Sequence, residues 1–81
     1  MRLSELARGA SAIVDHVADV HAADAVAGRL RDLGFVSGEP VRIVAAAPWG
    51  ADPILVQIGS TRFALRRAEA DRVRLRTEAA Q

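Results

Sequence analysis

Apolar residues recur along the chain with two different periods, and the longer period marks a helix. Val26, Leu30 and Leu33 stand at i, i+4 and i+7, so they share one face if the backbone is helical. We therefore predict one helix over His21–Leu33. Its first turn would hold Asp24, and its N-terminal cap would be Asp19 or His21.

The end of this helix is predicted by a glycine. Gly34 follows the last residue of the apolar stripe, and only glycine adopts the left-handed backbone of a helix ending without a steric penalty. Counting back makes Leu30 the residue that Phe35 contacts in a Schellman ending. Gly38 then supplies a turn before the next strand.

The shorter period is the alternation of half-buried strands. It predicts five of them, namely Ala10–Val17, Pro40–Ala47, Ile54–Ile58, Thr61–Leu65 and residues 72–76. In the second strand, Val41, Ile43 and Ala45 should share one face. Gly59 and Ser60 fit a two-residue type II′ hairpin turn.

Two short helical turns complete the pattern. One is expected at Leu3–Leu6, with Ser4 as its cap, and the other at Arg66–Asp71. Five short strands with one helix inserted between the first two predict a mainly β fold, a small closed or half-closed barrel. At this length we expect a single domain over residues 1–81, with residues 77–81 as a frayed tail.

Composition excludes several kinds of chemistry. The chain has no cysteine, which excludes disulfides, iron–sulfur clusters and a thiol nucleophile. It also lacks tyrosine and lysine, and neither histidine belongs to a recognisable nucleophile–base motif. No apolar run approaches the roughly 20 residues of a membrane span, and the N-terminus lacks the apolar region of a signal peptide. We therefore expect a cytoplasmic protein that is not an enzyme.

The turn after the helix carries a resemblance to a known family. The pattern L-x-x-L-G-F-V-x-G-x-x-V-x-I over residues 30–43 resembles that of the FeoA family, small proteins of ferrous iron transport. Later segments agree, among them Ala47-Pro48-Trp49-Gly50 and Phe63-Ala64-Leu65-Arg66. The likeness extends from about Ser4 to about Leu75. It implies an SH3-like barrel and a partner, the membrane transporter FeoB with its cytosolic GTPase domain.

A metal site is one candidate function. His16, His21 and Asp24 lie within nine residues, and the last two are i, i+3 at the start of the predicted helix. Imidazole and carboxylate groups suit Zn²⁺ or Fe²⁺. The spacing matches no closed four-ligand motif, so an ordinary solvated surface is the alternative. We expect no required cofactor, and only weak or adventitious binding of these ions.

The arginines offer a second candidate. Every basic residue is arginine, and six of the eleven lie between Arg62 and Arg76. A partner-binding surface would use the last strand and the turn before it, a set made up of Arg66, Arg67, Arg72, Arg74 and Arg76. The alternative is a solubilising outer face that blocks edge-to-edge pairing. Nucleic acid is an unlikely partner, because no aromatic platform is evident beside these arginines.

Trp49 has two interpretations. It is either a lid on the small core or an anchor for a partner, since tryptophan is enriched at interface hot spots. The resulting hypothesis is an accessory protein of ferrous iron uptake that binds a FeoB-type transporter. The alternatives are a metal-responsive regulatory domain and a small nucleic-acid-binding barrel. Neither the contact face nor the oligomeric state follows from the sequence.

Overall fold

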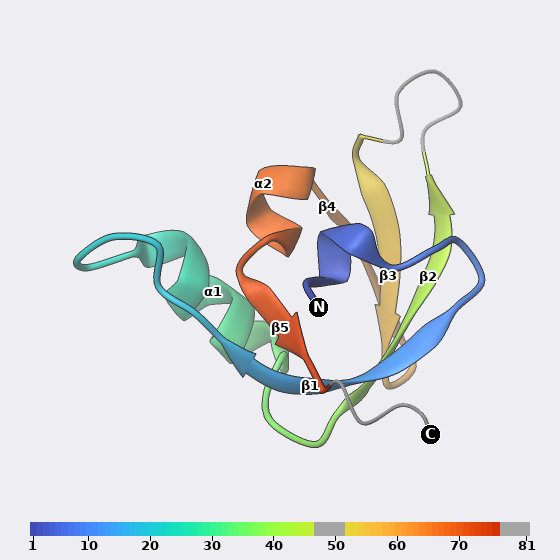
Figure 1. Ribbon diagram of the computed structural model, residues 1–81, viewed down its shortest axis with the longest axis horizontal. Helices are drawn as coiled ribbons and strands as arrows, with labels where there is room; N and C mark the ends of the chain where they lie inside the picture. Colours follow the sequence, from blue (N-terminus) through green and yellow to red (C-terminus); the bar gives the residue numbers. More distant parts are fainter. Residues whose placement is uncertain (47–51, 77–81) are drawn as a thin grey trace.

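One antiparallel sheet organises the chain, with its strands in the order β4-β3-β2-β1-β5 (Figure 1). The computed structural model describes residues 1–46 and 52–76. Within these ranges the elements are, in chain order, η1 (Leu3–Glu5), β1 (Ser11–Val17), α1 (Ala25–Leu33), β2 (Pro40–Ala46), β3 (Ile54–Ile58), β4 (Thr61–Leu65), α2 (Arg67–Ala70) and β5 (Val73–Leu75). The predicted mainly β fold, with a helix between the first two strands, is confirmed.

The sheet bends at β1, because this strand serves two neighbours in succession. Its first residues pair with β2, from Ser11 opposite Arg42 to Ile13 opposite Pro40. Its second half pairs with β5, and the register shifts between Val14 and His16. A strand shared in this way wraps the sheet around the core as in a half-closed barrel.

The start of the chain lies against the last strand. Arg2 forms an antiparallel bridge with Arg74, and the backbone N–H of Leu75 donates to the carbonyl of Met1 at 2.8 Å. The predicted Ser4 cap of η1 is wrong. Arg2 occupies the cap position, and the Ser4 hydroxyl instead hydrogen-bonds the carboxylate of Asp71, which joins η1 to the end of α2.

The core draws on every strand and both helices. Its largest fully buried side chains are Leu3, Val14, Phe35, Val41, Ile43, Val56, Leu65 and Val73. Phe35 meets Phe63 with ring centroids 6.0 Å apart, a tilted arrangement favoured by aromatic quadrupoles. No helix among the described residues is long and apolar enough to cross a bilayer.

Helix α1 ends as the sequence predicts. Gly34 has φ +114°, and its N–H donates to the carbonyl of Arg31 at 3.1 Å. The N–H of Phe35 reaches the carbonyl of Leu30, also at 3.1 Å. These two bonds are the Schellman pattern, and both Leu30 and Phe35 are buried. Gly38 follows with φ +94° in the turn that leads to β2.

The start of α1 differs from the prediction. The helix begins at Ala25 rather than at His21, and its cap is Asp24 rather than Asp19 or His21. The four residues before Ala25 cannot extend it, because Ala23 has φ +55° and Asp24 is extended. Residues 18–24 instead form the loop that projects from the left of the molecule in Figure 1.

Strand β2 departs from simple alternation. Val41 and Ile43 are buried as predicted, but the register against β3 shifts between Ile43 and Ala45. Ala45 therefore lies opposite Leu55 on the outer face, and the expectation that it shares the face of Ile43 is wrong. After this bulge β3 and β4 pair without interruption, and Gly59, with φ +60°, opens the two-residue turn between them.

Candidate interaction surface

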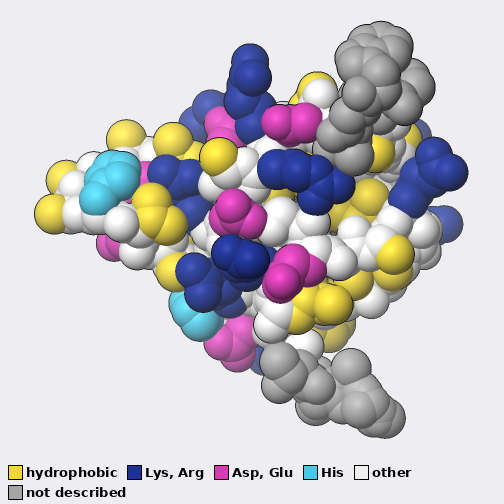
Figure 2. Space-filling view, turned by 45° about the horizontal axis from the view of Figure 1, so that its top comes forward, with side chains coloured by type: hydrophobic (Ala, Val, Ile, Leu, Met, Phe, Trp, Pro, Cys, Tyr) yellow, Lys and Arg dark blue, Asp and Glu magenta, His cyan; other side chains and the backbone are white. Residues whose placement is uncertain are grey.

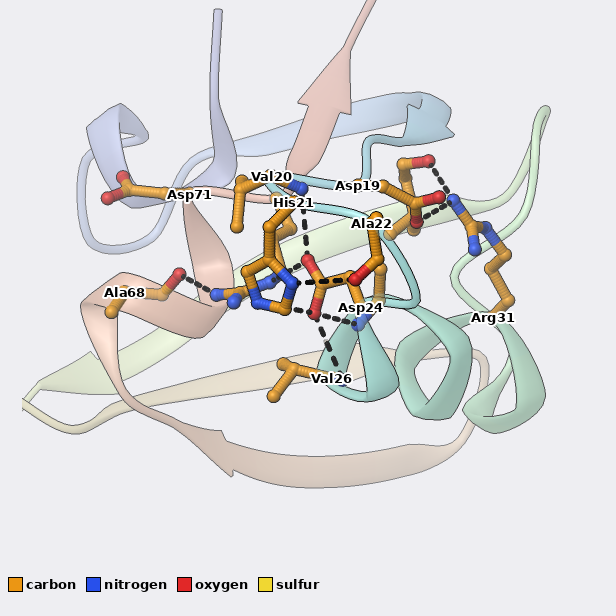
Figure 3. Close-up of polar contacts among 12 residues, drawn as sticks. Asp19, Val20, His21, Ala22, Asp24, Val26, Arg31, Ala68 and Asp71 are labelled. Carbon is orange, nitrogen blue, oxygen red and sulfur yellow. Dashed lines mark hydrogen bonds and ion pairs between the residues drawn. The ribbon is translucent and has the colours of Figure 1, made fainter.

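The Asp24 carboxylate is a meeting point of three segments (Figure 3). One oxygen, Oδ1, accepts the backbone N–H groups of Val26 and Ala27 at 3.2 and 3.3 Å, which is the capping role. The other oxygen, Oδ2, accepts the N–H of Val20 at 3.0 Å and Nε of Arg72 at 2.8 Å. The side chain is fully buried, so its negative charge is balanced almost entirely by these donors.

Arg72 reaches Asp24 from the other end of the chain. Its side chain is only 12% exposed, and a second guanidinium nitrogen donates to the carbonyl of Ala68 at 2.7 Å. The guanidinium holds the pKa of Asp24 well below its ordinary value, because it hydrogen-bonds the charged form. The N–H of Val20 acts in the same direction, whereas burial of the carboxylate acts against both. Arg72 is therefore a structural residue and not part of an exposed basic face.

The two histidines do not form one site with Asp24. Nδ1 of His16 lies 2.6 Å from a carboxylate oxygen of Asp15, whereas Nε2 of His21 lies 3.8 Å from Oδ1 of Asp24. Both imidazoles are exposed. Over residues 1–46 and 52–76, no three side chains of the metal-ligating types His, Cys, Asp and Glu gather. The predicted trio is thus not brought together, and the oxygens of Asp24 are already in use.

The remaining predicted arginines divide into engaged and exposed side chains. Arg67 donates to the carbonyl of Ser4 at 2.5 Å, and Nε of Arg74 donates to the carbonyl of Asp71 at 3.2 Å. Arg66 and Arg76 are exposed. Glu69 and Asp71 lie between these arginines along the chain, and Figure 2 shows acidic and basic side chains intermixed across the middle of one face.

One predicted residue lies outside the part of the chain described, and one pair of residues was missed by the sequence interpretation. Trp49, proposed as either lid or anchor, lies outside the described residues. The Asp24–Arg72 pair was missed, although an acidic residue directly before an amphipathic helix is an N-cap signal. The same signal at Asp19 obscured it, and nothing local points to a partner 48 positions away.

Comparisons with known proteins agree on one family. The family model described as the FeoA domain matches residues 1–77. The structure of Stenotrophomonas maltophilia FeoA, determined in complex with zinc and described as a procaryotic SH3 domain protein, is 59% identical, with a TM-score of 0.88 over 94% of this chain and 89% of that one. Chlorobium tepidum FeoA is 38% identical, with a TM-score of 0.82 over all of this chain and 73% of that one.

A more distant likeness concerns the fold alone. A manganese-dependent transcriptional repressor is 18% identical, with a TM-score of 0.75 over 90% of this chain and 39% of that one. No match is found among curated proteins. The family model, the 59% identity and the shared SH3-like fold together show that this chain belongs to the FeoA family.

Proposed function

We propose that this protein is a cytoplasmic, non-enzymatic accessory of ferrous iron uptake that binds a FeoB-type membrane transporter. The observation that carries the proposal is its similarity to S. maltophilia FeoA, which is described as a candidate ferrous iron transport activating factor. At 59% identity and a TM-score of 0.88 over nearly the whole of both chains, the two proteins share their backbone frame.

The described side chains support binding rather than chemistry. Two polar contacts between distant segments hold the fold, namely the Asp24–Arg72 pair and the hydrogen bond from Ser4 to Asp71. A catalytic site needs an acid, a base or a nucleophile left free to react with a substrate. A small barrel in which Asp24, Arg72 and Asp71 serve the fold is suited to presenting a surface to a partner.

The contact would include the exposed arginines at the start of α2 and the end of β5. Arg66 precedes α2, and Arg76 follows β5, where it donates to the hydroxyl of Ser37 over a long 3.4 Å. Arg74 lies between them and is half-buried. Their charges favour a partner with acidic side chains at the rim of the contact, which raises the association rate more than the final affinity.

Binding to the cytosolic part of the transporter tests the proposal. We expect the wild-type protein to bind it with a dissociation constant in the micromolar range in calorimetry or biolayer interferometry, and deletion of the gene to slow iron uptake. An Arg66→Glu, Arg76→Glu double variant should weaken binding. If the wild-type protein does not bind at high micromolar concentration and deletion leaves uptake unchanged, the proposal is wrong.

Metal binding by this protein would be weak and would need no dedicated site. The S. maltophilia relative was crystallised with zinc, and exposed imidazoles such as His16 and His21 are ordinary zinc donors. Because three donors do not gather among the described residues, a closed tetrahedral site is not supported. Zinc titration by calorimetry should give a weak affinity that falls further in a His16→Ala, His21→Ala double variant.

A further inference from the structure

The outer face of the sheet carries two parallel rows of side chains that neither the core nor the Asp24 cluster uses. Direct cross-strand pairing places Ser11, Arg42, Gln57 and Arg62 in one row through β1, β2, β3 and β4. Residues that are directly opposite in a sheet project from the same face, so these four side chains stand together. Arg42 and Arg62 are both exposed.

The second row is apolar. The bulge in β2 sets Ala45 opposite Leu55, and Leu55 lies opposite Ala64 in β4. Leu55 and Gln57 are two residues apart on one strand, so the rows run about 7 Å from one another. The first row therefore carries positive charge, and the second is a narrow apolar strip of small side chains around Leu55.

Each row has its own shallow hollow. The hollow at the polar row, of about 220 Å³, is lined by Ser11, Pro40, Val41, Arg42, Gln57 and Gly59. The hollow at the apolar row, of about 160 Å³, is lined by Ala45, Ala46, Pro53, Ile54, Leu55 and Ala64. Figure 1 shows α1, α2 and η1 to one side of β2, β3 and β4, so none of these three elements covers the rows.

The charge on this face is not neutralised by neighbouring side chains. Arg42 makes no hydrogen bond or ion pair with any described residue, and Arg62 donates only to the side chain of Gln57, at 3.2 Å. No acidic residue occupies an outward position of β2, β3 or β4 in the part of the chain described. The exposed acidic residue of β1, Asp15, lies four residues beyond Ser11 and is paired with His16. The α2–β5 side differs, because acidic side chains stand among its arginines (Figure 2).

We propose that this two-row face is a second docking surface, separate from the α2–β5 side, and that it binds an acidic amphipathic helix of the partner protein. Arg42 and Arg62 are two strands apart, a distance of about 10 Å. Carboxylates at i and i+7 of a helix are separated by a similar distance, about 10.5 Å along its axis. A helix crossing the strands would set those carboxylates over the arginines and its apolar stripe over Leu55 and the flanking alanines.

The chemistry of the face favours a protein helix over two other partners. Recognition of an anionic membrane by charge uses clusters of roughly four to eight basic residues, and this row supplies two. Single-stranded nucleic acid is bound on aromatic side chains, and the two rows contain none. The identity of the partner rests on the proposed function, whereas the surface can be tested apart from it.

The surface is tested with a peptide probe. We use a helical peptide of about 15 residues with glutamates at i and i+7 beside a leucine stripe, and the same peptide with glutamines as its control. Titrated into the ¹⁵N-labelled protein, the glutamate peptide should shift amide signals of Arg42, Leu55, Gln57, Arg62 and Ala64. The glutamine peptide should bind at least about fivefold more weakly. Equal binding of both peptides, or shifts confined to α2 and β5, would overturn the proposal.

Matched variants test the same surface by their binding to the cytosolic part of the transporter. Arg42→Glu, Arg62→Glu and Ala64→Glu should each weaken binding of its cytosolic part about fivefold or more, with unchanged melting temperatures. Arg29→Glu, an identical charge reversal on an exposed position of α1, should stay within about twofold of wild type. Wild-type affinity in all three face variants overturns the docking surface and leaves the proposed function intact.

The remaining outcomes separate the two ideas. The wild-type protein could bind the glutamate peptide through these residues and fail to bind the transporter. That result would support the docking surface and contradict the proposed partner. Binding only to vesicles containing anionic lipid, with no shift from either peptide, overturns the helix proposal in favour of a membrane contact.

Discussion

The carboxylate of Asp24 connects segments that are far apart along the chain. It caps α1, holds the backbone of Val20 in the preceding loop and pairs with Arg72 beside β5. Replacing one partner of a buried ion pair lowers the free energy of unfolding by more than the intact pair contributes to it, because the other charge stays buried without a partner. The side chain is therefore expected to be among the most sensitive polar positions in the protein.

Asp24→Asn tests this role while keeping the shape of the side chain. The amide can still accept one capping bond, but it cannot balance the guanidinium of Arg72. We expect the melting temperature to fall by more than about 5 °C. Asp32→Asn, on the exposed side of the same helix, serves as the control and should change it by less than about 2 °C. Equal effects of the two substitutions would mean that the buried pair contributes nothing specific.

The lowered pKa of Asp24 also predicts how stability depends on pH. Its ordinary value is 3.8, and hydrogen bonds from Arg72 and Val20 hold it lower in the folded protein. Below pH 3.8 the unfolded chain takes up a proton at this carboxyl that the folded chain still resists, so acid favours unfolding. The stabilisation is therefore complete above about pH 5 and is lost as the pH falls toward the lowered pKa.

Urea unfolding at pH 7, 4 and 3 measures this dependence. The wild-type protein should lose more unfolding free energy over the interval than Asp24→Asn, which has no carboxyl at this position to protonate. Glu5 also has a lowered pKa, chiefly through the backbone N–H of Arg2, but it is present in both proteins and cancels in the comparison. Parallel losses in the two proteins would contradict the assignment.

The limits of sequence reasoning are visible at this same position. Asp19 and Asp24 both precede the apolar stripe, and local spacing alone gives no reason to prefer either as the cap. Asp24 is stabilised as the cap by a hydrogen bond from Arg72, which lies 48 positions further along the chain. In the alternating pattern of the last strand, Arg72 occupies a position that predicts an exposed side chain. Its burial results from the contact with Asp24, which the pattern does not predict.

The ending of α1 was predictable because its chemistry is local. Gly34 has φ +114°, a conformation that a β-branched residue adopts only under strain. Gly34→Val should therefore lower the free energy of unfolding by more than about 1 kcal/mol in a urea melt. A neutral effect would show that the helix can end in another way.

Gly28 provides the opposite case within the same helix. It lies in the interior of α1, and a Cβ added there would meet no atom within 4 Å. Gly28→Ala should raise the free energy of unfolding by about 0.5–1 kcal/mol, because alanine loses less backbone entropy on folding. If the substitution destabilises the protein, some close approach to this face of α1 exists in solution.

The alternation of apolar and polar residues predicts some strands of the sheet better than others. It gave the bounds of β3 and β4 as the structure has them, since both are regular and their hairpin turn depends on Gly59. It failed in β2 beyond Ile43, where the bulge moves Ala45 to the outer face. A bulge leaves no signature in a run of small apolar residues, so the two-row face could not be recognised before the register was known.

The distribution of charge over the molecule argues against nucleic acid as a partner. The chain has a formal net charge of +1, and several of its arginines are held by the fold, as Arg72 is by Asp24. Fluorescence polarisation with a labelled single strand of about 20 nucleotides at 150 mM salt should show no binding at micromolar protein concentrations. Strong binding that weakens steeply with salt would contradict this expectation.

The pairing of Met1 and Arg2 with β5 has a consequence for how the fold gains its stability. The barrel can close only when β5 lies between the first residues and β1. The buried carboxylate of Asp24 likewise gains its charged partner only when Arg72, next to β5, is in place. Contacts between distant segments stabilise a fold only once the intervening chain has lost conformational entropy. We therefore expect a chain that lacks β5 to gain little of its stability, because Arg2, β1 and Asp24 would all lose their partners together.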